Sequence, residues 1–128
     1  MMEPLISIQI QEFRPSFRPG ELLTVDYQID AVAKGDLQAV EASVLWYTEG
    51  KGGEDLGVHY FERRVPGDAE DRDLRSWRRF QLNLPNSPMT YEGFLLKIRW
   101  CVRIRVFLKH GKQVVSEHPF VLGEVANI

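Results

Sequence analysis

The sequence predicts an all-β fold, an antiparallel β-sandwich of two sheets with about seven strands. Apolar and polar residues alternate with a period of two along most of the chain, as they do in strands with one buried face. Turn-forming residues interrupt these segments at short intervals, and no segment has a convincing helical pattern. Many short strands at such spacing are typical of a sandwich.

The first three strands are expected at residues 5–13, 22–32 and 40–48. In the first, Ile6, Ile8 and Ile10 alternate with polar residues. A tight turn at Pro19-Gly20 leads into the second, because proline presets its own φ and glycine accepts a positive φ. The buried faces of the second and third strands are then Leu23, Val25, Tyr27 and Ile29, followed by Val40, Ala42, Val44 and Trp46.

Four more strands are expected at residues 58–65, 77–84, 95–109 and 113–122. Residues 66–75 form the most polar segment and predict an exposed loop. The long segment 95–109 has the strongest alternation, and His110-Gly111 is a hairpin turn signal. We expect a core that includes Ile8, Val25, Tyr27, Val44, Trp46, Leu82, Ile98, Trp100, Val102, Ile104 and Val106.

The last hairpin has two registers that the sequence allows. One turns Val114, Ser116, His118 and Phe120 inward and pairs Arg105 with Glu117 outside, whereas the other buries Val115 and Glu117. We favour the first, because burying an unpaired glutamate is costly.

The length, charge and cysteine content of the chain argue against several classes of protein. The chain has 128 residues, which fits a single domain over residues 1–128. Its 16 Lys and Arg against 18 Asp and Glu give a net charge of −2, so a nucleic-acid partner is not expected. The single cysteine, Cys101, excludes an intrachain disulfide. The start at Met1-Met2-Glu3-Pro4 lacks a signal-peptide pattern, and with the lone cysteine this predicts a cytoplasmic protein.

Two segments resemble arrestin-like domains. The first is Phe17-Arg18-Pro19-Gly20-Glu21-Leu22-Leu23-Thr24-Val25. The second contains Phe80-Gln81-Leu82-Asn83-Leu84-Pro85, then Pro88-Met89-Thr90-Tyr91-Glu92-Gly93, then Ile98-Arg99-Trp100-Cys101-Val102. Together they cover about a third of the chain. The resemblance implies an arrestin-like or immunoglobulin-like sandwich and a general role in protein recognition.

The chain departs from that family in two respects. Arrestins carry two such sandwiches, and this chain has room for one. Val25 stands where the family often has glycine. The resemblance therefore implies no particular receptor or pathway. In the second segment, Pro85 would end a strand, Gly93 would permit a bend, and the Tyr91 hydroxyl would bond to nearby backbone, as at a sandwich corner.

The candidate binding face is a row of cations on the outer side of segment 95–109, namely Lys97, Arg99, Arg103 and Arg105. Alternate residues of a strand lie about 6.6–6.8 Å apart, so the row would form a basic stripe. Such a stripe could bind an acidic peptide, a phosphate or a lipid head group. The alternative is cross-strand pairing with carboxylates such as Glu41, Glu49 and Glu117.

Other candidate sites are weaker. The acidic run Asp68, Glu70, Asp71 and Asp73 lacks calcium-loop spacing and contains Arg72. His59, His110 and His118 are dispersed, and no serine has a nucleophile-elbow context. Cys101, if outward, would have a thiol pKa lowered by its arginine neighbours, but no base accompanies it. Trp46 and Trp100 belong to inward phases, whereas Trp77 follows the polar loop and is expected to be exposed.

The sequence thus predicts no catalytic residues, metal or cofactor. We expect a non-catalytic, cytoplasmic interaction or scaffolding module with an unidentified protein partner, bound at a sheet edge or on the basic face. The alternatives are a peripheral phospholipid or acidic-ligand binder that uses Lys97, Arg99, Arg103 and Arg105, and a hydrolase whose site the sequence hides. Self-association through open sheet edges is a further expectation.

Overall fold

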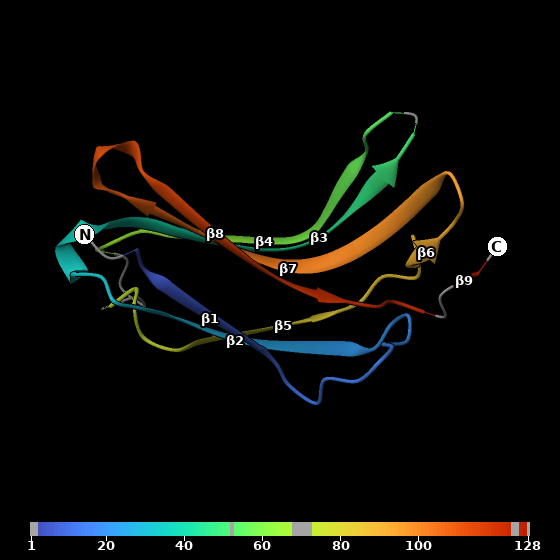
Figure 1. The fold of residues 1–128 in the computed structure, drawn as a ribbon. Helices are drawn as coiled ribbons and strands as arrows, with labels where there is room; N and C mark the ends of the chain where they lie inside the picture. The colour runs from blue at the N-terminus through green and yellow to red at the C-terminus, as the bar shows by residue number, and fades with distance from the viewer. Residues whose placement is uncertain (1–2, 52, 68–72, 124–125, 128) are drawn as a thin grey trace.

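A computed structural model describes residues 3–51, 53–67, 73–123 and 126–127. Two sheets face each other (Figure 1). The smaller sheet has the order β1-β2-β5, with strands Leu5–Ile10, Leu22–Asp30 and Arg78–Asn83. The larger sheet contains β3 (Leu37–Gly50), β4 (Leu56–Arg64), β6 (Tyr91–Glu92), β7 (Leu96–Leu108), β8 (Gln113–Phe120) and β9 (Ala126–Asn127).

The larger sheet is built around its two longest strands, β3 and β7. It runs in the order β4-β3-β7, and β6 and β8 both pair with β7, with β9 beside β6. Ile98 of β7 pairs with Tyr91 of β6, whereas Trp100 already pairs with Phe120 of β8. The pairs are antiparallel except β6–β9, and two 3₁₀ turns lie at Lys34–Asp36 and Lys109–Gly111.

The predicted fold class is confirmed. Seven described strands have six residues or more, and they coincide with the seven segments that the alternation picks out. The strand bounds differ by a few residues, most clearly for β3, which runs from Leu37 to Gly50 rather than from residue 40 to 48. This extension follows its neighbour, because β7 pairs with β3 over nearly its whole length.

The core lies between the sheets and contains most of the predicted residues. Val25, Tyr27, Val44, Trp100, Val102, Ile104 and Val106 are fully buried. Ile8, Trp46 and Leu82 are partly buried against them, and Ile98 is half-buried near the start of β7. Aromatic residues from loops complete the core: Phe17 is buried and its ring lies edge-on to Phe120.

The last hairpin adopts the favoured register with one correction. Phe120 faces the core, and Val114, Ser116 and His118 share its side of the sheet. Glu117 is paired with Arg103, however, and Arg105 lies opposite Val115. The predicted Arg105–Glu117 pair is therefore wrong, because the turn at Lys109–Gly111 sets the register two residues away from that pairing.

The predicted corner after Pro85 is stabilised by Thr90 rather than Tyr91. Thr90 donates its backbone N–H to the Leu122 carbonyl, and its hydroxyl oxygen accepts the Leu122 N–H at 2.9 Å. No hydrogen bond of the Tyr91 hydroxyl occurs among the described residues. The Tyr91 ring instead packs directly over Gly93, where a Cβ atom would collide with it. Gly93 is thus required for space, not for a positive φ.

The larger sheet is strongly curved. Figure 1 shows the ends of β3, β4 and β7 rising away from the smaller sheet, so the outer side of the larger sheet is concave. We call this side the concave face. It carries the outward residues of β3, β4, β7 and β8, which include all four candidate cations.

Candidate functional site

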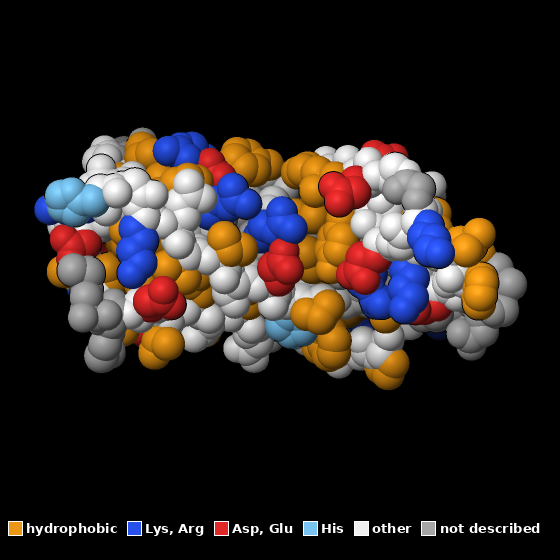
Figure 2. All heavy atoms as spheres, turned by 45° about the horizontal axis from the view of Figure 1, so that its top comes forward, with side chains coloured by type: hydrophobic (Ala, Val, Ile, Leu, Met, Phe, Trp, Pro, Cys, Tyr) orange, Lys and Arg blue, Asp and Glu red, His pale blue; other side chains and the backbone are white. Residues whose placement is uncertain are grey.

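The centre of the concave face is apolar. Leu45 of β3 and Cys101 of β7 lie opposite each other on it, and they are only 1% and 2% exposed although none of the described strands or helical turns covers them. Figure 2 shows the face from outside, with apolar side chains in the middle of the larger sheet. The more exposed members of this group are Leu56, Val58, Phe61 and Val115, each between 46% and 55% exposed.

This apolar centre arises from a break in the alternation of β4. A bulge between Val44 and Leu45 pairs Tyr60 with Val44 and Val58 with Leu45, so residue 59 is extra. Tyr60 consequently turns inward and stacks on Phe80 at 4.7 Å, whereas Val58 and Phe61 both turn outward. The sequence of residues 58–65 does not show this bulge, because a bulge is formed with a neighbouring strand.

The four candidate cations lie on this face as predicted, and three of them are in ion pairs. Arg103 Nε lies 2.6 Å from Glu117, and Arg99 contacts both Glu49 at 3.1 Å and Glu92 at 3.0 Å. Lys97 Nζ is 3.6 Å from Glu92. Two of the carboxylates proposed for cross-strand pairing, Glu49 and Glu117, therefore do pair with the stripe.

Arg105 differs from its neighbours. Its partner across the ladder on β3 is Glu41, but that carboxylate is held 2.6 Å from Arg63 of β4. On the other side Arg105 lies beside Val115. Among the described residues no carboxylate lies within ion-pair distance of Arg105. It is thus the cation of the row that is available to a ligand.

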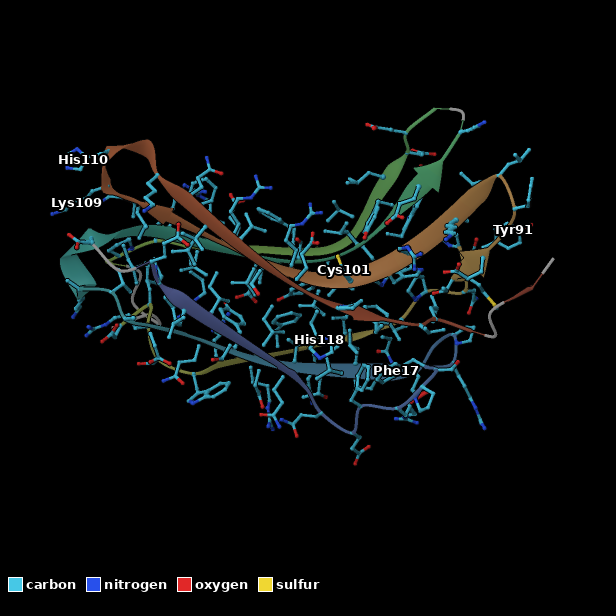
Figure 3. The ribbon with its side chains drawn as sticks, in the orientation of Figure 1. Phe17, Tyr91, Cys101, Lys109, His110 and His118 are labelled. Atoms are coloured by element: carbon cyan, nitrogen blue, oxygen red, sulfur yellow. The ribbon has the colours of Figure 1, made fainter. Side chains whose placement is uncertain are left out.

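Cys101 faces outward as the alternation requires, but its expected activation is wrong. Figure 3 shows its side chain on the concave side of β7, with His118 on the opposite side of the sheet. Burial raises the pKa of the thiol to about 12, and the Glu117 carboxylate adds to this effect. Arg103 lowers the pKa, but its charge is weaker than the effect of desolvation. The buried thiol is therefore unsuited to nucleophilic chemistry.

The remaining sequence candidates are not brought together. Asp68, Glu70 and Asp71 lie outside the described residues; Asp73 is described, and the side chain of Arg75 holds its pKa at about 2. His59 Nε2 donates a hydrogen bond to the Asn83 carbonyl oxygen, and His110 occupies the β7–β8 turn. Within the described ranges, no three metal-ligating side chains cluster, and no helix is long and apolar enough to cross a membrane. Trp77 is 54% exposed, as expected.

Sequence reasoning missed a polar cluster on the inner side of β4. The Glu62 carboxylate accepts hydrogen bonds from the hydroxyls of Tyr27 at 2.9 Å and Tyr60 at 2.5 Å, and from Arg78 Nε at 3.1 Å. Arg64, which is 4% exposed, donates to the Tyr27 hydroxyl oxygen at 3.1 Å. Desolvation and the Glu62 charge raise the pKa of Tyr27 far above its usual value. Because side chains of both sheets converge on the Glu62 carboxylate, this cluster joins the two sheets rather than forming a site.

Comparisons with known proteins identify a solved structure with a similar fold. No family model matches the chain, and no curated protein sequence matches it. Among solved structures, it is similar to the crystal structure of Spo0M, a sporulation control protein from Bacillus subtilis, with a TM-score of 0.60 at 13% identity. The sandwich is arrestin-like. The match covers 97% of this chain but 51% of Spo0M, so the chain spans about half the length of that protein.

Proposed function

We propose that this chain is a non-catalytic regulatory or scaffolding module that binds a partner protein on its concave face. The observation that carries the proposal is the arrangement around Leu45 and Cys101. Along the outward row of β7, the Arg103–Glu117 ion pair follows this apolar centre, and Arg105, which has no carboxylate partner among the described residues, comes next. The ion pairs of Arg99 lie on the other side of the centre. Interfaces commonly have this anatomy, with an apolar core, a polar rim and a few anchoring residues.

The face is a better candidate than the edges of the larger sheet. β4 is one edge of the larger sheet, and its bulge beside Val58 disrupts the regular row of backbone groups that a partner strand would need. β8 forms part of the other edge and contains Pro119, which has no backbone N–H to donate. Both features discourage strand addition. The concave face has no comparable obstruction.

The arrestin-like fold supports a regulatory rather than a catalytic role, although fold alone does not specify function. Spo0M is named as a sporulation control protein, which is also a regulatory description. A cytoplasmic location is part of the proposal. It is supported by a single, buried, unpaired cysteine, which suits a reducing compartment.

Site-specific photocrosslinking tests the proposal. A photoreactive phenylalanine analogue at Phe61 or Val115 should crosslink a discrete partner in extract from the source cells. The same analogue at Leu22, which is similarly exposed on the smaller sheet, is the matched control. We expect Arg105→Glu, introduced beside the probe at Phe61, to abolish the crosslink without unfolding the protein. Equal crosslinking from Leu22, or no effect of Arg105→Glu, would contradict the proposal.

A phospholipid or other acidic ligand on the same cations is the second candidate, and Arg105 is the observation that favours it. The ion pairs of Lys97, Arg99 and Arg103 weigh against it, because an anionic surface would compete with carboxylates already in place. Sedimentation with phosphatidylserine vesicles at low and high salt separates the two functions. Salt-sensitive binding that Arg105→Glu removes would replace the protein partner with a lipid surface.

A further inference from the structure

A second surface lies at the end of the sandwich where β6 turns into β7. Phe94 is 88% exposed and Leu95 is 61% exposed, which makes them the two most exposed large apolar side chains of the described residues apart from Leu5. We call this pair the knob. A phenylalanine so fully exposed to water is unfavourable unless it contacts another molecule.

The knob is held in place rather than carried on a loose loop. Gly93 donates its N–H to the Leu96 carbonyl at 3.0 Å, and Lys51 of the β3–β4 hairpin donates to the Leu95 carbonyl at 3.0 Å. Gly50 and Gly93 lie so close to Leu95 O and the Tyr91 ring that a Cβ atom would collide at either position. The backbone that carries Phe94 is therefore held in place, so little backbone freedom is lost on binding.

A pocket that could receive such a side chain lies near the same end. The partner of β7 changes from β6 to β8 between Ile98 and Trp100, and a pocket of about 230 Å³ opens there. We call this pocket the notch. Its walls include Phe13, Pro15, Trp100 and Pro119, and its rim includes Glu92 and Arg99. A cavity of about 150 Å³ suffices for benzene, so the notch has room for a phenyl ring.

We propose that the occupant of the notch is the knob of a second copy of this chain, in a symmetric dimer. Phe94 directly follows Glu92-Gly93, so knob and notch share one end of the molecule, and a twofold axis can insert both knobs at once. The charges agree with this arrangement. Arg99 and Glu92 are paired at 3.0 Å on the rim, so a second copy that covers the rim meets a surface of mixed charge rather than an excess of one sign.

The same charges argue against an anionic membrane as the occupant. The cations near the knob face a comparable number of carboxylates on the same strands and hairpin: Lys51, Lys97 and Arg99 against Glu49, Glu54, Asp55 and Glu92. A peripheral membrane site for acidic lipids needs an excess of cations. A second copy of the chain needs no excess of cations, because it presents the same mixture of positive and negative side chains.

Sedimentation velocity and light scattering over a wide range of protein concentration test the dimer. The wild type should approach twice the chain mass of 14.8 kDa. Phe94→Ser should weaken dimerisation at least about tenfold, as loss of an interface anchor does. Trp77→Ser removes another exposed aromatic side chain, one that belongs to neither the knob nor the notch, and should leave dimerisation unchanged. A monomeric wild type, or a dimer that Phe94→Ser does not weaken, would overturn the proposal.

A mixing experiment tests whether knob and notch are partners. Pro15→Arg should block the notch and weaken dimerisation as Phe94→Ser does, with the fold of each variant checked by circular dichroism. In an equimolar mixture, the knob of the Pro15→Arg chain can enter the intact notch of the Phe94→Ser chain, so the mixture should associate more than either variant alone. No gain on mixing would overturn the assignment. Binding of a monomeric wild type to neutral vesicles through Phe94 would instead assign the knob to lipid.

Discussion

The hydroxyl of Tyr27, in the smaller sheet, donates a hydrogen bond of 2.9 Å to the carboxylate of Glu62, in the larger one. The same carboxylate accepts from Tyr60 and Arg78, so one acidic side chain that is 11% exposed satisfies three donors. This polar contact bridges the two sheets on the side where β4 approaches β5. Its energy depends on every member being present.

Glu62→Ala should lower the free energy of unfolding by about 2–4 kcal/mol, because it leaves the hydroxyls of Tyr27 and Tyr60 and the Arg78 guanidinium group without their shared acceptor. Urea denaturation followed by circular dichroism measures the change. Glu41→Ala is the matched control, since Glu41 pairs with Arg63 on the exposed face, and it should cost at most about 1 kcal/mol. Equal losses for the two variants would refute the bridging role of Glu62.

Alkaline pH should destabilise the protein through Tyr27 and Tyr60. Burial raises the pKa of both phenols above the ordinary value of 10.0, and the Glu62 charge adds to the shift. The unfolded chain therefore loses these protons first as pH rises, and stability falls from about pH 10 upward. Below that pH the contribution is fully present. The double variant Tyr27→Phe/Tyr60→Phe should show a shallower decline, measured by denaturation at a series of pH values.

Cys101 should resist thiol reagents in the folded protein. Its pKa of about 12 leaves almost no thiolate at about pH 8, and its sulfur is inaccessible. Reaction with a chromogenic disulfide should be at least about a hundredfold slower than in urea, where one equivalent reacts promptly. Fast reaction of the folded protein would mean that the apolar centre of the concave face is open, which would also weaken its proposed role as an interface core.

Gly93→Ala should destabilise the corner by about 1–3 kcal/mol, because the new Cβ would collide with the Tyr91 ring and lie 2.7 Å from the Leu96 carbonyl oxygen. Gly35→Ala provides the control, since a Cβ atom there meets nothing within 4 Å and should change stability by less than about 0.5 kcal/mol. Thermal denaturation of both variants distinguishes them. A neutral Gly93→Ala would show that the ring moves aside freely.

Much of the fold could be predicted because strand alternation is local. The faces of β2, β3 and β7 follow from the period of two, and residues such as Val25 and Val102 are buried as that period requires. The segment at β4 was the least informative, since its bulge shifts the phase at His59 and turns Val58 and Phe61 to the same side. A bulge is formed with a neighbouring strand, so its position was not visible in β4 alone.

The candidate site was predicted only in outline. The outward phase of Lys97, Arg99, Arg103 and Arg105 could be identified from β7 alone, but which of them keeps a free charge could not. That depends on Glu41 being taken by Arg63 from β4 and on Glu117 facing Arg103. The knob and the notch were missed entirely, because Phe94 seemed an ordinary apolar residue at the start of a long strand.

The sequence by itself determined the class of fold, the approximate positions of the strands along the chain and, for most strands, the side that faces the core, because these follow from the alternation and the turn residues within a few positions. Tertiary structure alone decided the environments of the outward residues. Cys101 is buried and inert, Arg105 has no carboxylate partner among the described residues, and Glu62 joins two sheets, since each outcome depends on strands distant in sequence that pairing and curvature bring together.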